Sequence, residues 1–465
     1  MEVLLKKNTR TLQDSFQLMA RKIEHAIHET SFLEKTESIL RFEIPIEDVA
    51  ILPWLSRQKE IRKFYWADRD RHWQVGAVGT AHLIHGNTPR SYGPLFKTLR
   101  KNFSLRYKNL RYYGGISFDS FRKNDPQWQA FGGYQFILPR FEVIKTNGTT
   151  LFACNLFKKE INSNRTQLIK ELNSLSFPLE AKREEVPLFE SRKDFPPHDQ
   201  WIDLVETILK SLRGTNKQKV VLARKSLLKF KQPVDPFWIM EQLTIFSPHC
   251  FHFFWQPKRA VAFLGASPEM LYEREGRLVK SEAIAGTRCR GSSEVEDEKL
   301  RDELLTSDKE NREHDLVVKA IREVFGKFCR QFEEDKEKSL LQLEDGQHLI
   351  SRFSGILNEE VRDEDLLKNL HPTPAVGGSD RRWAKKIIRY YEPFSRGWYT
   401  GLMGCVGADT AAFAVAIRSG LVCRNQTELY SGAGIVKGSN PQEEWKEVEN
   451  KIGGFLRVLC RTKSR

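Results

Sequence analysis

Short runs of aromatic and β-branched residues, separated by Gly, Asn and Pro, fill residues 60–155. Runs of this composition are typical of strands that end in tight turns. After residue 200, similar runs alternate with long helical patterns at about 297–330, 380–392 and 441–460. The sequence contains neither a Rossmann fingerprint nor a P-loop. The pattern predicts an α+β protein with much antiparallel sheet.

The chain divides into three predicted parts. Residues 1–182 combine a helix over 11–40, where apolar residues recur at helical spacing, with the strand-rich region. Residues 183–200 are charged, contain three prolines and show no periodicity, so they resemble a linker. Residues 201–465 form the second, larger region. We expect the strands of the first part to pack into the same fold as the second.

The composition favours a protein with an anionic partner. The 465 residues carry a net charge of +14, which suits either a nucleic-acid binder or an enzyme for a small polyanionic substrate. The basic residues are spread along the chain, and no zinc-finger, RNP1 or basic-zipper signature is present. We therefore expect no nucleic-acid partner.

The sequence predicts a cytoplasmic protein without a membrane partner. No run of 18 apolar residues marks a membrane span, and the first residues lack the apolar core of an export signal. The seven cysteines are scattered and form no CxxC pair, which favours reduced thiols over disulfides or a zinc site.

Two glutamates lie on the apolar side of a predicted helix. Ser307 and Glu310 fit a capping box, which places the start of the helix near Asp308. At about 100° per residue, Glu310 and Glu313 project from the centre of the apolar stripe of this helix. A carboxylate on the core side of a helix is costly unless it is paired or bound to a metal.

The segment EEWKEVENK (443–451) holds a second such pair. Glu444 borders the apolar stripe of its predicted helix and Glu447 lies at the margin, whereas Glu443 and Glu449 point elsewhere. Four carboxylates from two helices would suit a hard divalent cation such as Mg²⁺. Ion pairs with the abundant Lys and Arg would satisfy the same glutamates. The residues alone leave both interpretations open.

Lys219 and Glu269 are candidates for proton transfer. Lys219 begins an apolar strand, from which it could reach solvent or enter a cleft and act as a base with a lowered pKa. Glu269 lies in a Ser-Pro turn after a strand, which suits either a general acid in a cleft or an exposed hairpin carboxylate.

Several groups could hold an anion. The turns at 283–288 and 430–438 contain glycines, whose backbone N–H groups can approach an anion closely. Arg418 lies on an otherwise apolar strand and could grip a carboxylate or form a structural salt bridge. His371 precedes a Pro-rich turn, where it could contact a ligand or belong to the loop.

The order of the motifs resembles one enzyme family. Across residues 219–451 the segments are KVVLAR, GASPEM, AIAGTR, KENREH, HPTPAVGG, RGWYTG, AFAVAIRSG and SGAGIVKGSNPQEEWKEVENK. This series resembles the chorismate-utilising enzymes, which include anthranilate, aminodeoxychorismate, salicylate and isochorismate synthases. More loosely, FYWADRD and FGGYQFILPRFEV are similar to N-terminal strands of isochorismate synthases. The resemblance implies the fold of anthranilate synthase component I, with large antiparallel sheets and helices packed outside them.

The resemblance also implies roles for individual positions. Lys219 matches the base that activates water for attack at C2 of chorismate, and Glu269 matches the acid that protonates the departing C4 hydroxyl. These roles require a lowered pKa for the lysine and a raised one for the glutamate, and burial favours both. Arg418, Tyr399 and the turn around Gly432 match the positions that hold the enolpyruvyl carboxylate. The other positions implied in substrate binding are Thr287, His371 and Lys437.

A metal is implied as well. Glu313 and Glu447 match ligands of Mg²⁺, with Glu310 and Glu444 as nearby or water-mediated partners. The ion would hold the ring carboxylate of chorismate. Glu443 and Glu449 are then expected to be solvated neighbours of the site.

Three features favour isochorismate synthase within the family. Lys219 stands where ammonia-using members carry glutamine, and Ala285 stands where aminodeoxychorismate synthases carry a nucleophilic lysine. PAVGG at 374–378 resembles isochorismate synthases. The chain is therefore expected to be a monomeric, Mg²⁺-dependent isomerase that interconverts chorismate and isochorismate, of the type that serves menaquinone biosynthesis. The alternatives are salicylate synthase, anthranilate synthase component I and an inactive scaffold.

Two positions depart from the family pattern. Cys289 and Ser379 stand where proline is frequent in the family. Both are expected in loops near the site, where they would affect the shape of the pocket more than the chemistry.

Overall fold

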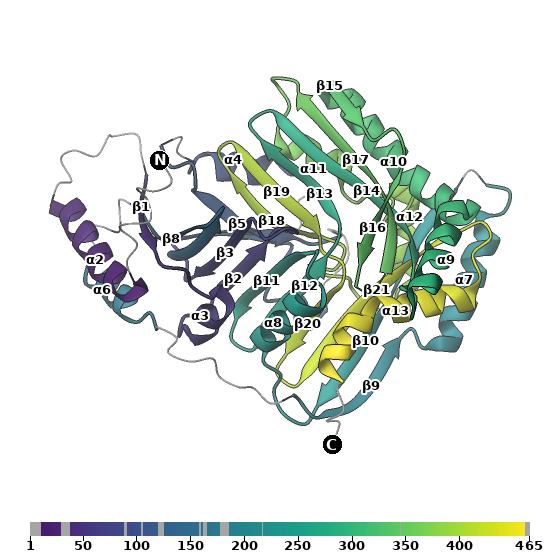
Figure 1. Cartoon of the computed structure of the whole chain (residues 1–465), viewed down its shortest axis with the longest axis horizontal. Coiled ribbons are helices and arrows are strands. Elements are labelled where there is room, and N and C mark those ends of the chain that lie inside the picture. Colours follow the sequence, from purple (N-terminus) through teal and green to yellow (C-terminus); the bar gives the residue numbers. More distant parts are fainter. Residues whose placement is uncertain are drawn as a thin grey trace.

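Two large antiparallel sheets make up most of the protein, whose computed structural model describes residues 11–28, 38–87, 91–103, 106–119, 125–157, 160, 165–176, 186–215, 217–344 and 346–460. The two sheets share one aromatic core, and helices cover their outer faces (Figure 1). This arrangement confirms the predicted α+β fold with helices outside the sheets.

The first sheet has eleven strands and draws on both halves of the chain. Strands from the N-terminal region lie at one side, and β2 joins them to strands from the C-terminal region through β11. In spatial order the strands are β1 (Ile39–Ile46), β8 (Thr149–Phe157), β7 (Phe141–Thr146), β3 (Trp73–Val78), β2 (Lys63–Ala67), β11 (Phe251–Lys258), β12 (Val261–Ser267), β20 (Ser419–Cys423), β21 (Gln426–Val436), β10 (Lys219–Phe230) and β9 (Phe189–Phe195).

The second sheet has ten strands and is also shared between the two regions. Its β5 pairs with β18, so the N-terminal strands are integral to this sheet as well. The spatial order is β15 (Cys329–Glu334), β17 (Gly346–Leu357), β14 (Leu278–Arg288), β13 (Met270–Glu275), β19 (Thr410–Val415), β18 (Leu402–Gly407), β5 (Arg111–Ile116), β6 (Tyr134–Leu138) and β4 (His82–Gly86), with β16 (Ser339–Leu343) beside β17.

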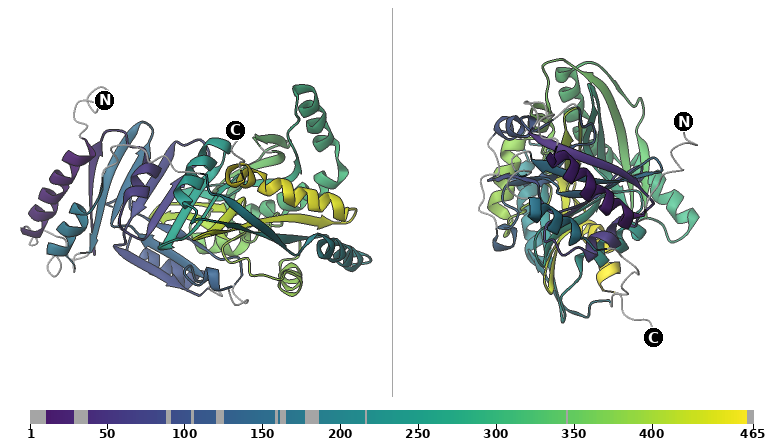
Figure 2. Two further views of the ribbon diagram at one scale, coloured as in Figure 1. Left: turned by 90° about the horizontal axis from the view of Figure 1, so that it is seen from below. Right: turned by 90° about the vertical axis from the view of Figure 1, so that its left-hand side faces the viewer.

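The helices surround the sheets, with α2 at one end of the molecule and α7 near the other (Figures 1 and 2). No helix within the described residues is long and apolar enough to cross a membrane. The helices are α2 (Leu12–His28), α3 (Ile51–Arg57), α4 (Gly93–Arg100), η3 (Pro126–Trp128), α6 (Arg165–Asn173), α7 (His198–Leu212), α8 (Pro236–Phe246), α9 (Glu294–Thr306), α10 (Asp308–Phe328), α11 (Asp363–Leu370), α12 (Arg381–Tyr391) and α13 (Pro441–Leu459).

Two expectations about the chain differ from the structure. The predicted helix over 11–40 ends at His28, residues 29–37 lie outside the described part, and β1 begins at Ile39. Within the linker-like segment 183–200, of which 183–185 are not described, Phe189–Phe195 forms the edge strand β9, paired with β10. The charged residues of this segment fit an edge position, where one side of the strand faces solvent.

Aromatic side chains fill the core between the two sheets and pack beneath the region that contains Tyr399 and Tyr430. Trp128 is fully buried and contacts Phe131 and Phe263 edge-on, with ring centroids 5.2 Å away in each case. It also lies 5.9 Å from Tyr430, which stacks on Tyr399 at 5.2 Å. Each buried aromatic ring of this kind contributes roughly 2–3 kcal/mol through burial.

The two helices that carry the glutamate pairs begin where the sequence predicts. The side chain of Ser307 accepts a hydrogen bond from Glu310 N, so α10 begins at Asp308. Asn440 caps α13 by accepting from two backbone N–H groups, and Pro441 occupies the first turn. Such caps satisfy N–H groups that have no partner inside a helix.

Candidate active site

A cavity lies where β10, β14 and β21 meet α10 and α13. Lining residues come from each of these elements, with Glu313 on α10 and Lys451 beyond the second glutamate pair on α13. The sequence-selected residues among them are Glu269, Thr287, Glu313, Tyr399, Arg418 and Gly432. Positions far apart in the sequence, chosen from separate motifs, therefore face one space.

Glu269 lies between β12 and β13 and is almost completely buried. Thr373 Oγ1 donates to its Oε1 at 3.1 Å. Burial raises the pKa of Glu269 to about 7, although Thr373 and the charge of Lys219 act in the opposite direction. This carboxyl can hold a proton near neutral pH, which is the condition for a general acid. The exposed hairpin carboxylate considered above is excluded.

Lys219 is fully buried at the first position of β10, so its side chain does not reach solvent. Its Nζ donates to Glu313 Oε1 at 2.8 Å. Its backbone is fixed by Ser379, which accepts from Lys219 N and donates to Lys219 O, both at 3.1 Å. Proline cannot donate such a bond, so the departure at Ser379 supplies a contact that holds the candidate base.

A group of cations and one glycine forms another wall of the cavity. Arg418 lies here with a backbone φ of 48°, and its Nη1 donates to Lys451 O at 3.4 Å. Lys451 Nζ donates to Gly432 O at 2.9 Å. A Cβ at Gly432 would come within 3.1 Å of the Tyr399 hydroxyl, so a side chain would crowd the cavity. Two cationic groups and a close backbone suit a carboxylate ligand.

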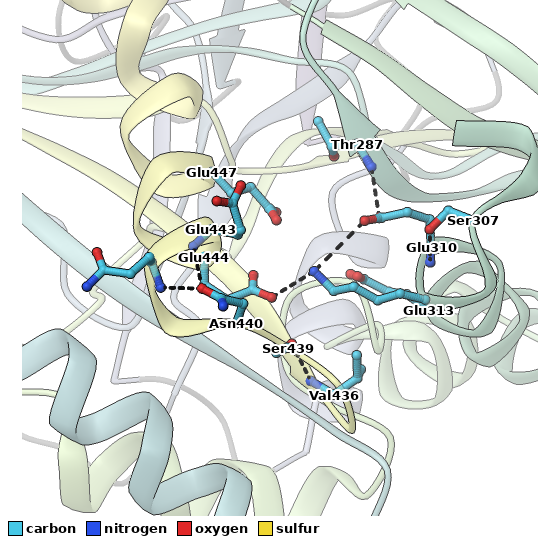
Figure 3. Close-up of polar contacts among 12 residues, drawn as sticks. Thr287, Ser307, Glu310, Glu313, Val436, Ser439, Asn440, Glu443, Glu444 and Glu447 are labelled. Atoms are coloured by element: carbon cyan, nitrogen blue, oxygen red, sulfur yellow. Dashed lines mark hydrogen bonds and ion pairs between the residues drawn. The ribbon is translucent and has the colours of Figure 1, made fainter. Parts of the chain in front are cut away.

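The glutamates of α10 and α13 face one another across a short gap (Figure 3). Each of the four has a basic partner in the structure. The pairs are Glu310 with Arg288 at 2.8 Å, Glu313 with Lys219 at 2.8 Å, Glu444 with Lys309 at 2.7 Å and Glu447 with Lys451 at 2.6 Å. Of the two interpretations that the sequence left open, the ion pairs are therefore the one that the structure shows.

The donor chemistry at this gap also fits a hard cation. Lys309 Nζ lies 2.7 Å from Glu444 Oε1 and 3.9 Å from Glu310 Oε1, and Glu447 acts on it electrostatically. One positive group thus already lies among three carboxylates. Within the described ranges, no three His, Cys, Asp or Glu side chains surround one point as metal ligands would. The residues fit a divalent cation in charge and donor type while each remains bound to a basic side chain.

The pKa values of Glu444 and Glu447, the two glutamates of α13, are shifted in opposite directions. Burial and the neighbouring charge of Glu447 raise the pKa of Glu444. Burial also acts to raise the pKa of Glu447, but the charges of Lys451 and Lys309 outweigh it and lower the pKa. A cation near both carboxylates would favour their ionised forms.

The outer glutamates of the segment 443–451 differ from each other. Glu443 is exposed, as expected. Glu449 was expected to be solvated, but both of its oxygens accept from Arg192, at 2.7 and 2.6 Å. Arg224 also lies 2.8 Å from it, and these bonds lower the pKa of Glu449 to about 2. Glu449 fastens α13 to β9 and β10 and does not face the cavity.

Three further predicted residues have different positions. Thr287 lines the cavity, and its N–H donates to Glu310 Oε2 at 3.2 Å. His371 is buried behind the wall, where its Nε2 donates to the carbonyl of Thr400 at 2.9 Å. Lys437 is exposed in a turn and is not part of the cavity lining. His371 therefore supports the wall, and Lys437 is not brought to the other residues.

Sequence reasoning missed several residues of the site. Lys451 lines the cavity and lies four positions after Glu447, a spacing that places both side chains on one helix face. Thr373 belongs to the motif around His371, but nothing local indicates that it bonds Glu269. His348 lines the cavity from β17 and carries no sequence signal of that role. The second departure, Cys289, is exposed and its Sγ accepts from Asn450.

The sequence profile of a family described as chorismate binding enzymes matches residues 24–460, and the chain belongs to this family. The isochorismate synthase 2, chloroplastic, of Arabidopsis thaliana is 31% identical over 91% of this chain and 81% of its own length. The predicted relationship to isochorismate synthases is confirmed.

Solved structures agree with the fold. The structure of MenF, the menaquinone-specific isochorismate synthase from Escherichia coli, matches with a TM-score of 0.82 and 28% identity, over 96% of this chain and 100% of that one. Anthranilate synthase component I from Streptococcus pneumoniae matches with a TM-score of 0.67 and 21% identity, over 82% and 91% of the two chains. The second likeness concerns the fold alone.

Proposed function

We propose that this chain is an isochorismate synthase, which converts chorismate to isochorismate by adding water at C2 with loss of the C4 hydroxyl. The observation that carries the proposal is a cavity lined by the buried, proton-holding Glu269 together with Arg418 and Lys451. The buried Lys219 lies behind it, with its Nζ 2.8 Å from Glu313, which also lines the cavity. The reaction needs a base, an acid and positive charge for two carboxylates, and these residues supply the base, the acid and the cations for one of the carboxylates.

Lys219 and Glu269 divide the proton transfers between them. The amine of Lys219 accepts a proton from water as the water oxygen bonds to C2, and the ring double bonds shift. The carboxyl of Glu269 gives its proton to the C4 hydroxyl, which leaves as water. Lys219 ends as an ammonium and Glu269 as a carboxylate, so returning the proton from one to the other through solvent completes the cycle.

The ion pair between Lys219 and Glu313 bears on the timing of this chemistry. An ammonium that donates to a carboxylate at 2.8 Å cannot accept a proton. The amine must therefore lose a proton before attack on C2. Glu313 also lines the cavity, where a bound cation would offer its carboxylate a different partner.

The two substrate carboxylates have separate binding groups in this proposal. Arg418, Lys451 and the backbone at Gly432 hold the enolpyruvyl carboxylate, with Tyr399 packed beside them. Glu313 and Glu447 would hold Mg²⁺, and Glu310 and Glu444 would lie close to the ion. When bound, the ion would supply positive charge to the ring carboxylate.

The choice among family activities rests on two positions. Lys219 supports water as the nucleophile, since a neutral lysine amine can deprotonate water. Ala285 lines the cavity with a methyl group, so no nucleophilic amine is available at that position for covalent addition. Both support isochorismate formation over the amine-forming reactions.

The wider biological role is also proposed. The likeness to MenF of Escherichia coli over 96% of the chain supports a place in menaquinone biosynthesis. We further expect the reaction to run reversibly and in the cytoplasm. We expect a monomer, because the residues assigned to the site come from one chain. We expect no nucleic-acid partner, because the basic residues are spread along the chain.

Product analysis tests the proposal directly. Purified protein is incubated with chorismate, with and without Mg²⁺, and the products are separated by chromatography and identified by mass. Isochorismate formed only with Mg²⁺ supports the proposal, and chorismate formed from added isochorismate supports reversibility. Salicylate with pyruvate would identify a salicylate synthase. An absence of turnover, even with added ammonia, would refute an enzymatic role with this substrate.

A further inference from the structure

Arg69 reaches from the N-terminal strands to the turn that carries Glu269. It lies between β2 and β3, and its guanidinium donates to both oxygens of Glu282 on β14, at 3.0 and 2.5 Å. Its Nη2 also donates to Pro268 O at 2.6 Å. These contacts join positions 213 and 199 apart in the chain. The side chains of Arg69 and Glu282 are 15% and 7% exposed, so the ion pair is largely shielded from water.

The contacted turn is where the chain passes from the first sheet to the second. β12 ends at Ser267 and β13 begins at Met270, so Pro268 and Glu269 connect the two sheets. The carbonyl of Pro268 and the N–H of Glu269 belong to one planar peptide unit. That N–H donates to Ser267 Oγ at 3.2 Å. A bond to the Pro268 carbonyl therefore helps to fix the direction in which the Glu269 side chain leaves the backbone.

Glu282 also acts on Glu269 through its charge. Burial raises the pKa of Glu269, and the negative charge of Glu282 adds to this effect. The bidentate bonds from Arg69 offset that charge and satisfy a carboxylate that would otherwise be buried without a partner. The groups that lower the pKa of Glu269 are Thr373, Lys219 and Lys451.

We propose that Arg69 is a positioning residue for Glu269, which it serves by holding the Pro268 carbonyl and by neutralising Glu282. The inference rests on the proposed role of Glu269 as the general acid. Arginine suits this task because its planar fork binds a carboxylate through two bonds and still donates a third. The ammonium of a lysine is a point charge on a flexible stem and cannot reproduce this three-point contact.

The test measures kcat and KM for chorismate against pH in the full-length protein. Arg69→Met should lower kcat at least about tenfold, because misplacement of a catalytic group slows the chemical step, and leave KM within about twofold. It should also shift the alkaline fall of kcat to higher pH, since Glu282 is no longer neutralised and Glu269 keeps its proton longer. Arg69→Lys keeps a positive charge, so it should restore the pH profile but not the rate.

A matched control and a double variant separate position from charge. Arg100 donates two hydrogen bonds to Glu364, at 2.6 and 2.7 Å, and the two residues are 264 positions apart in the chain. Neither residue lines the cavity. Arg100→Met should leave the pH profile unchanged. Adding Glu282→Gln to Arg69→Met should return the alkaline fall of kcat to its original pH while the rate stays low. A lower Tm with an unchanged profile in Arg69→Met would overturn the proposal.

A measurement without substrate distinguishes failure of this inference from failure of the proposed function. The Tm difference between the protein and its Glu269→Gln variant is followed against pH, with and without Arg69→Met. If Arg69 acts on Glu269, the midpoint of this pH dependence moves upward in the Arg69→Met background, whether or not chorismate is a substrate. An unchanged midpoint would contradict the inference even if the wild-type protein forms isochorismate.

Discussion

Replacing Glu269 with glutamine should abolish turnover and, above pH 7, make the protein more stable. Burial raises the pKa of this carboxyl from 4.5 to about 7, against the opposing effects of Thr373 and Lys219. Between these two values the folded protein holds a proton that the unfolded chain has released, so stability falls as the pH rises through this range. Above pH 7 both states are ionised, and the buried charge costs the folded state about 3 kcal/mol.

Glutamine cannot ionise, and its amide oxygen can still accept the bond from Thr373, so the variant avoids this cost. For a chain of 465 residues the entropy of unfolding is on the order of 1 kcal/mol/K. The Tm of Glu269→Gln should therefore exceed that of the wild type by about 3 °C at pH 8 and by less than about 1 °C at pH 5.

Differential scanning calorimetry of both proteins at the two pH values measures this difference. Glu360→Gln serves as the control, because Glu360 is exposed and should give no pH-dependent change. Equal Tm values at pH 8, or a lower value for Glu269→Gln, would refute the conclusion that burial holds the pKa of Glu269 near neutrality.

Three further substitutions test the site. Lys219→Ala should lower kcat by about 10²- to 10⁴-fold with an unchanged circular dichroism spectrum, and a variant that keeps most of its activity would remove Lys219 as the base. Glu447→Gln should raise the half-saturating Mg²⁺ concentration for activity about tenfold, whereas an unchanged titration would place the metal elsewhere. Lys309→Met removes the ammonium that binds Glu444, so Mg²⁺ should raise the Tm at about tenfold lower concentration, and weaker binding would contradict competition between Lys309 and the ion.

The long helices were predictable because their signals are local. Residues 308–328 and 441–459 combine an apolar stripe with a capping side chain at the first turn, and both helices begin at the expected residue. The strand Phe189–Phe195 gave no such signal. Its charged residues suit an edge position, and its pairing with β10 depends on chain segments that are distant before folding. An edge strand does not need apolar residues on both faces, so its composition can be as charged as that of a linker. For this reason the composition of this segment predicted a linker.

The glutamates of the segment 443–451 show the same division within the site. In sequence the cluster looks unfavourable, because like charges three or four positions apart on a helix repel. Glu447 finds a local partner in Lys451 at i+4, but Glu444 binds Lys309 from 135 positions away. The distant pairing depends on the placement of α10 beside α13, which no periodicity reveals. A carboxylate that is paired with a lysine is already in position inside the protein. It can therefore exchange the lysine for a cation of higher charge without a rearrangement of the helices. If the proposed Mg²⁺ binds, ion pairing and metal binding, which the sequence could not separate, would therefore be two occupancies of one arrangement of glutamates.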